Sequence, residues 1–167
     1  MTAGDLGPGV DLEISAAAES DVPGLVETAA LSWREGFSNF LGPEDIERYV
    51  EASFSSEAFR KRMEDPTQEW VLARDAGEVV GFALFGDRGM GPELMLLYVR
   101  PSHWRLGVGR RLLASIEDHA RSRGIVRYRA LAHRRNERGV AFYEGQGFSR
   151  EDAPDRHDHW AMMKRLE

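Results

Sequence analysis

An unbroken run of six apolar residues, from Leu94 to Val99, is the longest in this 167-residue chain. A strand that is apolar on both faces is typical of the centre of a sheet that is covered on both sides. A Pro-containing loop follows it, and residues 108–123 then carry apolar side chains at helical spacing. The run is also far shorter than the roughly 20 residues that a membrane-spanning helix needs. It therefore predicts the central strand of a domain that mixes strands and helices.

Short elements of both kinds lie on either side of this strand. Alternating apolar residues at 10–14 predict a first strand, and helical spacing predicts a helix from Val22 to about Gly36. The patterns that follow predict helices at 44–53, 56–63 and 137–144, a hairpin formed by 70–73 and 79–85, and strands at 128–132, from 147, and at 159–166. No repeat interrupts the pattern, so we expect a flexible tail at 1–9 and a single α/β domain over 10–167.

Charge is distributed unevenly along the chain. Residues 1–99 hold 7 basic and 19 acidic side chains, whereas residues 100–167 hold 15 basic and 9 acidic ones. The net charge of −6 argues against a general nucleic-acid binder, and a basic segment within an acidic protein favours one anionic ligand held locally. A solvated basic helix face is the alternative.

Cysteine is absent, which excludes disulfides and Cys-ligated zinc. The first residues contain neither a basic segment nor an apolar stretch of the kind that a secretory signal has. We therefore expect a cytoplasmic protein.

Glycines lie where the loop after the central strand meets the next helix, at Gly107 and Gly109. Glycine lets the backbone approach a ligand closely, and the free N–H groups at the start of a helix attract anions. Arg105, Arg110 and Arg111 add full positive charges. The loop lacks the third glycine of a dinucleotide-binding motif and the Gly-Lys-Ser/Thr of a P-loop. From these residues alone, an anion cradle and a simple tight turn both remain open.

Two separated motifs in this sequence resemble those of the GNAT acetyltransferase superfamily. The first is Gly107-Val108-Gly109 after the strand-ending Pro101. The second comprises Asn136, Ala141 and the run Phe142-Tyr143-Glu144-Gly145-Gln146-Gly147-Phe148. Gly81-Phe82 in the expected hairpin and Ser32-Trp33-Arg34 in the first expected helix are further similarities. The resemblance extends from Ile14 to Leu166, and it implies a GNAT-like α+β fold: a mixed, mostly antiparallel sheet of six to seven strands flanked by about four helices.

The resemblance implies that the chain binds acetyl-CoA. The pyrophosphate would lie on backbone N–H groups after the central strand, and the pantetheine arm would run beside that strand. The residues so implied are Leu97, Val99, Trp104, Arg105, Leu106, Gly107, Val108, Gly109, Arg110 and Asn136. Trp104 departs from the family, whose members carry Arg or Gln at this position. A cradle built mainly of backbone groups should tolerate that change of side chain.

Acetyl transfer also needs groups that move protons, and the resemblance implies two. Tyr143 would protonate the departing thiolate, because a phenol is neutral at pH 7; a packed core aromatic is the alternative. Glu93, which opens the central strand, would act as the base directly or through water; a solvated carboxylate is the alternative. Alternation places Glu93, Met95, Leu97 and Val99 on one strand face, the face of the thioester. Trp33 and Arg34 would line the acceptor pocket, although Trp33 also suits a core position.

These observations together predict an acetyl-CoA-dependent N-acetyltransferase that works by direct transfer in a ternary complex. A non-catalytic acyl-CoA-binding module is the alternative, and it would need neither Tyr143 nor Glu93. We expect no metal, no nucleic acid and no membrane as partners, and the resemblance is compatible with a homodimer. The acidic excess of residues 1–99 predicts a cationic amine acceptor, unless those acids are only solvated helix faces.

Overall fold

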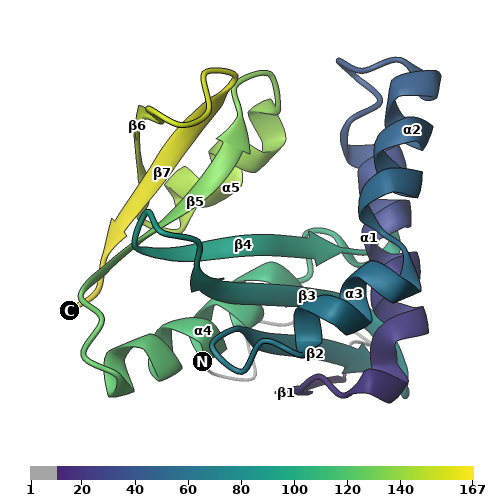
Figure 1. Ribbon diagram of the computed structural model, residues 1–167, viewed down its shortest axis with the longest axis horizontal. Helices are drawn as coiled ribbons and strands as arrows, with labels where there is room; N and C mark the ends of the chain where they lie inside the picture. Colours follow the sequence, from purple (N-terminus) through teal and green to yellow (C-terminus); the bar gives the residue numbers. More distant parts are fainter. Residues whose placement is uncertain (1–10) are drawn as a thin grey trace.

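A computed structural model describes residues 11–167, which form one seven-stranded sheet covered by helices on both faces (Figure 1). The strands lie in the order β1-β2-β3-β4-β5-β7-β6, and only the β4–β5 pair is parallel. They are β1 (Leu12–Ala16), β2 (Glu69–Asp75), β3 (Glu78–Asp87), β4 (Pro92–Val99), β5 (Arg127–His133), β6 (Ser149–Asp152) and β7 (His159–Arg165). The predicted sheet is thus confirmed. The expected tail, residues 1–9, lies outside the described residues, as does Val10 of the first expected strand.

Five α-helices flank the sheet within residues 11–167, at the five places where helical spacing predicted them, and the resemblance implied about four. They are α1 (Val22–Gly36), α2 (Pro43–Ser53), α3 (Ser56–Met63), α4 (Val108–Ser122) and α5 (Glu137–Gly145), with short 3₁₀ turns η2 (Glu19–Asp21) and η3 (Pro101–His103). Each face of the sheet has its own apolar core. The α4 stripe, including Leu112 and Ile116, and Val140 of α5 pack on one face. Residues of α1, α2 and α3, including Leu25, Ile46 and Phe59, pack on the other.

The sheet opens between its two central strands. β4 and β5 pair only at Glu93 with Arg129 and at Leu94 with Ala130, and β5, β7 and β6 then turn away from β4 together with α5 (Figure 1). On its other side β4 stays paired with β3, where the N–H of Arg100 donates to the carbonyl of Val80 at 2.8 Å. Because hydrogen-bonding directions alternate along an antiparallel strand, the backbone groups of Leu97 and Val99 face the opening.

A β-bulge at Met95 changes which residues of β4 share a face. Leu84 pairs with Leu96 and Phe85 pairs with Leu94, so Met95 is an extra residue on β4. Leu94, Leu97 and Val99 pack against the α4 core, whereas Met95, Leu96 and Tyr98 pack against the core formed by α1, α2 and α3. The expectation that Glu93 and Leu97 share a face was therefore wrong. By alternation from Leu94, Glu93 lies on the α1–α3 side of the sheet.

Candidate active site

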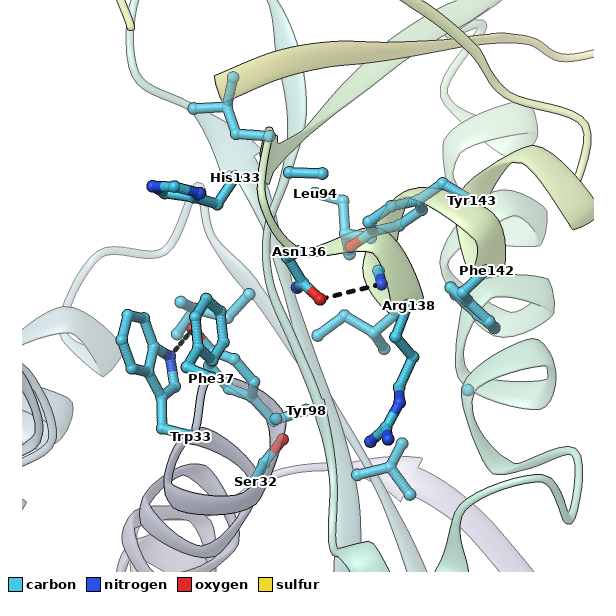
Figure 2. Close-up of a pocket in the computed structure, with 18 of the residues that line it drawn as sticks. Ser32, Trp33, Phe37, Leu94, Tyr98, His133, Asn136, Arg138, Phe142 and Tyr143 are labelled. Atoms are coloured by element: carbon cyan, nitrogen blue, oxygen red, sulfur yellow. Dashed lines mark hydrogen bonds between the residues drawn. The ribbon is translucent and has the colours of Figure 1, made fainter. Parts of the chain in front are cut away.

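A cavity of about 1440 Å³ passes through the opening between β4 and β5. Its walls come from both halves of the molecule. On the α4 side it is lined by the loop after β4, the start of α4 and the inner face of α5. On the other side it is lined by α1, α2, the end of α3 and the β3–β4 turn. Figure 2 shows these walls facing one another, with Trp33 and Phe37 on one side and Phe142 and Tyr143 on the other. The cavity joins two chambers on opposite faces of the sheet.

The loop at the start of α4 has the backbone form of an anion cradle. Arg105 and Gly107 adopt positive φ angles of 63° and 83°, and α4 begins at the next residue, Val108. Alternating left-handed residues turn successive N–H groups toward one point, and the helix start adds its free donors. Most predicted cofactor residues line the cavity: Leu97, Val99, Trp104, Arg105, Gly107, Val108, Gly109, Arg110 and Asn136. Leu106 is not among the lining residues.

Gly109 serves helix packing. A Cβ atom at this position would lie 3.1 Å from Cζ and 3.3 Å from Cε2 of Phe142, which is closer than ordinary contact. The missing side chain therefore lets α4 approach α5 at the inner end of the cavity. The two glycines were expected to act alike, as places where the backbone approaches a ligand. In the structure Gly107 satisfies a backbone angle and Gly109 satisfies the packing of two helices, while the approach of a ligand to both stays a prediction.

Trp104, at a position where the resemblance led us to expect Arg or Gln, makes two side-chain interactions. Its Nε1–H donates to the carbonyl of Val99 at 2.7 Å, so one backbone group that faces the opening already has a protein partner. The guanidinium of Arg138, from the first turn of α5, lies 4.1 Å from the centre of the indole ring. This distance is typical of a cation–π contact. Arg138 also lines the cavity, so the contact brings a positive charge to the cradle that the sequence patterns did not indicate.

Asn136 orders the start of α5. Its side-chain oxygen accepts a hydrogen bond from the N–H of Gly139 at 3.1 Å, as an N-cap residue does. A Cβ at residue 139 would lie 2.6 Å from Asn136 Nδ2, so the cap depends on glycine there. The expectation was that Asn136 would contact the pantetheine arm or order this loop, and its hydrogen bond fits the second role.

Tyr143 projects from α5 into the cavity, where Figure 2 shows its hydroxyl group turned toward the opening. Its ring packs edge-on against Phe142 and Phe148, at centroid distances of 5.4 and 5.1 Å. Within residues 11–167, no group is hydrogen-bonded to its hydroxyl. Burial raises the pKa of Tyr143 well above its usual value of 10.0, so the phenol keeps its proton at neutral pH. The group has the position and protonation state of a proton donor.

Glu93 lies in different surroundings from those expected of a base. Its side chain is 2% exposed, and it accepts from Arg88 at 2.6 Å and from Arg129 at 3.0 Å. Arg129 also binds both oxygens of Asp155 at 2.9 Å, which holds the pKa of that carboxyl at about 2. Glu93 and Arg129 are the residues at which β4 and β5 pair. This ion pair therefore lies at the point from which the two strands diverge, and each carboxylate oxygen of Glu93 is already engaged.

Of the two residues expected to contact the acceptor, only Trp33 lines the cavity. Its ring is stacked between Phe37 and Tyr49, at centroid distances of 3.8 and 3.9 Å, and its Nε1–H donates to the hydroxyl of Tyr98 at 2.9 Å. Arg34 points away and forms a two-point ion pair with Glu47 on α2, at 2.7 and 3.1 Å. Trp33 is thus both a core residue and a wall of the cavity, whereas Arg34 ties α1 to α2.

Comparison with known proteins identifies this architecture. The sequence model of the Acetyltransferase (GNAT) family matches residues 30–148. The chain belongs to this family. It is 27% identical over 147 residues to a spermidine N(1)-acetyltransferase of Thermoplasma acidophilum, a match that covers 86% of this chain and 91% of the relative. N-alpha-acetyltransferase RimI of Mycobacterium tuberculosis is 33% identical over 97 residues, 56% of this chain and 60% of RimI.

A solved structure of similar fold has coenzyme A bound. The PaiA N-acetyltransferase of Thermoplasma acidophilum, in complex with coenzyme A, superposes with a TM-score of 0.85 at 25% identity. The match covers 93% of this chain and 99% of PaiA. In the part of the acetyltransferase that the structure describes, no three His, Cys, Asp or Glu side chains are arranged to hold a metal ion. No helix within residues 11–167 is long and apolar enough to cross a bilayer.

Two functional candidates in this acetyltransferase were missed at the level of sequence. Arg138 is one. The other is His133, at the end of β5, which lines the cavity and stacks on Phe40 at 5.1 Å between ring centres. Burial lowers the pKa of His133, and its Nδ1 accepts the N–H of Arg135 at 3.1 Å. The neutral ring therefore carries its proton on Nε2 and acts as a donor. A pattern of alternating residues could place His133 on a strand end but could not indicate Phe40 as its partner.

Proposed function

We propose that this acetyltransferase moves the acetyl group of acetyl-CoA directly to an amine, with both substrates bound in one ternary complex. One observation carries the proposal: a single cavity joins the α4 cradle to a second chamber on the opposite face of the sheet. An amine that enters from the α1–α3 side can reach a thioester that enters from the α4 side. A covalent enzyme intermediate is not required for such a transfer.

Each group of residues would then have a separate role. Acetyl-CoA supplies the acetyl group as an activated thioester. The cradle from Arg105 to Arg110 holds the pyrophosphate, and the backbone groups of Leu97 and the N–H of Val99 bind the pantetheine arm in the opening. As the amine nitrogen bonds to the carbonyl carbon and the carbon–sulfur bond breaks, Tyr143 gives its proton to the leaving thiolate. The acylated nitrogen releases its extra proton to water in the cavity, and the phenolate of Tyr143 takes up a proton from that water, which restores the phenol. The buried and therefore protonated state of Tyr143 supports that role.

Glu93 is better suited to anchor β4 to β5 than to take the proton of the amine. A base needs a free lone pair near the nitrogen, and both carboxylate oxygens of Glu93 accept from guanidinium groups. We therefore propose that the amine loses its proton to water in the cavity and that Glu93 positions β4 and β5. A non-catalytic acyl-CoA-binding module is disfavoured, because it has no use for a second chamber or for an unpartnered phenol.

The acidic excess of residues 1–99 supports attraction of the acceptor amine as its ammonium ion. The name of the spermidine-acetylating relative agrees with an amine that is charged in solution. If this field steers the acceptor, kcat/KM should fall as salt rises, because the Debye length shrinks from about 10 Å at 0.1 M to about 3 Å at 1 M. A value of kcat/KM that does not change with salt would show that the charge asymmetry does not attract the acceptor. A cytoplasmic location and a homodimer remain predictions.

Release of CoA in the presence of amines, followed with Tyr143→Phe, tests the proposal. The ring of phenylalanine keeps the contacts with Phe142 and Phe148, and the lost hydroxyl has no protein partner within the described residues, so Tm should not change. A loss of kcat on the order of 10²-fold with an unchanged KM for acetyl-CoA is expected for one proton donor. An unchanged kcat would reduce Tyr143 to a packing residue.

A further inference from the structure

The chamber on the α1–α3 side of the cavity is lined by hydrogen-bond donors. We call it the acceptor chamber, and its walls include Tyr49, Arg62, Arg88, Tyr98 and the ion-paired Glu93. Tyr98 accepts the Nε1–H of Trp33, so its own hydroxyl proton is left to point elsewhere. Burial raises the pKa of Tyr98 well above 10.0, which keeps that proton in place. The hydroxyls and guanidinium groups together form a surface that donates hydrogen bonds to a ligand.

Arg62 is a cation of this chamber that has no counterion within residues 11–167. It lies in the last turn of α3, and its guanidinium is 6.0 Å from the centre of the Trp70 ring. No carboxylate within residues 11–167 lies within 4.0 Å of it. Burial and the nearby charge of Arg88 both lower the pKa of Arg62, as expected of a cation without a partner. Arginine nevertheless stays protonated at neutral pH, so a positive charge faces the cavity.

The neighbouring carboxylates do not supply the missing partner. Glu93 is shared between Arg88 and Arg129, and Asp155 is bound by Arg129. Three guanidinium groups, those of Arg62, Arg88 and Arg129, thus face two carboxylates. Two further carboxylates line the cavity, those of Glu35 and Asp45. Neither lies within 4.0 Å of the Arg62 guanidinium, and Asp45 pairs with Arg48 at 3.0 Å. A half-buried charge that is left unpaired costs free energy, and a ligand of opposite charge removes that cost.

We propose that the acceptor chamber binds a carboxylate, so that the acceptor of the transfer is an amine that also bears a carboxylate, as an amino acid does. The inference rests on the proposed function for the amine end of the acceptor. Arg62 supplies planar paired donors that match a carboxylate, and the hydroxyls of Tyr98 and Tyr49 add single donors. The aromatic wall formed by Trp33, Phe37 and Phe54 contacts the apolar body of the acceptor. The acidic excess of residues 1–99 attracts only the ammonium end of such an acceptor, and Arg62 is the local positive charge that holds its carboxylate end.

Matched acceptor pairs test the inference by turnover. Lysine is compared with 1,5-diaminopentane, and phenylalanine with 2-phenylethylamine, each pair differing by the carboxylate alone. A charge-assisted hydrogen bond predicts that kcat/KM for the carboxylate member is higher by on the order of ten- to a hundredfold. Arg62→Met should remove this preference and Arg62→Lys should restore part of it. Arg60→Met is the matched control: Arg60 lies on the same helix but outside this cavity, so the preference should persist.

Direct binding separates this inference from the proposed function. The probe is 3-phenylpropanoate, a carboxylate without an amine, titrated calorimetrically into the wild-type protein and into Arg62→Met. Affinity that falls at least tenfold in Arg62→Met but not in Arg60→Met supports the carboxylate site, even if no amine is acetylated and the proposed function fails. Absence of binding to the wild type, or equal affinity in Arg62→Met, overturns the inference. Turnover that is equal within each acceptor pair overturns it as well.

Discussion

Replacing Glu93 with glutamine distinguishes between its two proposed roles, as a base for the amine and as an ion-paired link between β4 and β5. Glutamine keeps the volume of the side chain but removes the charge that Arg88 and Arg129 share. Breaking a buried ion pair from one side costs about 3–5 kcal/mol. Arg129 keeps its ion pair with Asp155, and the side chain of Arg88 is 47% exposed. The loss of unfolding free energy should therefore lie near the lower end of this range. At about 2–4 °C per kcal/mol for a chain of this length, Tm should fall by roughly 6–12 °C.

The assay is thermal unfolding together with the pH dependence of kcat. If Glu93 anchors the strands, Glu93→Gln lowers Tm and leaves the shape of the pH profile unchanged among the molecules that remain folded. Glu47→Gln is the matched control, because it breaks an ion pair whose two side chains are about half exposed, and Tm should hardly change. A variant that keeps the wild-type Tm but loses kcat together with the acidic limb of its pH profile would refute the reasoning and restore Glu93 as the base.

Three further expectations concern the cradle and the divergence point. Gly107→Ala puts a Cβ on a residue with φ of 83°, at a cost of about 1–2 kcal/mol, and should weaken CoA binding in calorimetry. Gly124→Ala, at φ of 76° outside the cradle, should cost similar stability and leave CoA affinity intact. Because the pKa of Asp155 is lowered from 3.8 to about 2, its stabilising effect is present above pH 4 and is lost as pH falls toward 2; in Asp155→Asn, thermal unfolding should show a shallower loss over that range. Trp104→Phe removes the hydrogen bond to Val99 and should raise KM for acetyl-CoA, with little change in kcat.

Local patterns were enough to predict the helices and strands that form the proposed cofactor side of this enzyme. The apolar run of β4, the break at Pro101 and the amphipathic α4 depend on residues close together in sequence. Gly107 fits this description: the anion cradle and the tight turn that the sequence left open both place a turn before the amphipathic helix, and the residue has a φ of 83°. The position of Tyr143 on α5 followed from a motif whose spacing is that of one short helix. In these places the sequence neighbours of a residue are also its spatial neighbours.

The acceptor side was harder to predict, because its contacts join distant segments. The bulge at Met95 arises from the register of β4 against β3, which no alternation within β4 reveals, and it moves Glu93 to the other face. Arg34 was expected in the pocket, but its partner Glu47 lies on the next helix and draws it away. In the sequence, Arg62 is one of three consecutive basic residues, and no local pattern distinguishes it from the other two. Only the fold shows that it faces a cavity without a counterion.

The two-residue pairing of β4 with β5 also has a consequence for thermodynamic linkage. Beyond Leu94 and Ala130 the molecule has two half-sheets that no strand hydrogen bonds join. A ligand that lies along the free edge of β4 replaces the missing strand and binds only when the halves are correctly placed. Such a ligand, at 100 times its Kd, stabilises the folded state by about 2.7 kcal/mol. Acetyl-CoA would then act as a part of the sheet, and its concentration would contribute to the free energy of unfolding as well as to the rate of turnover.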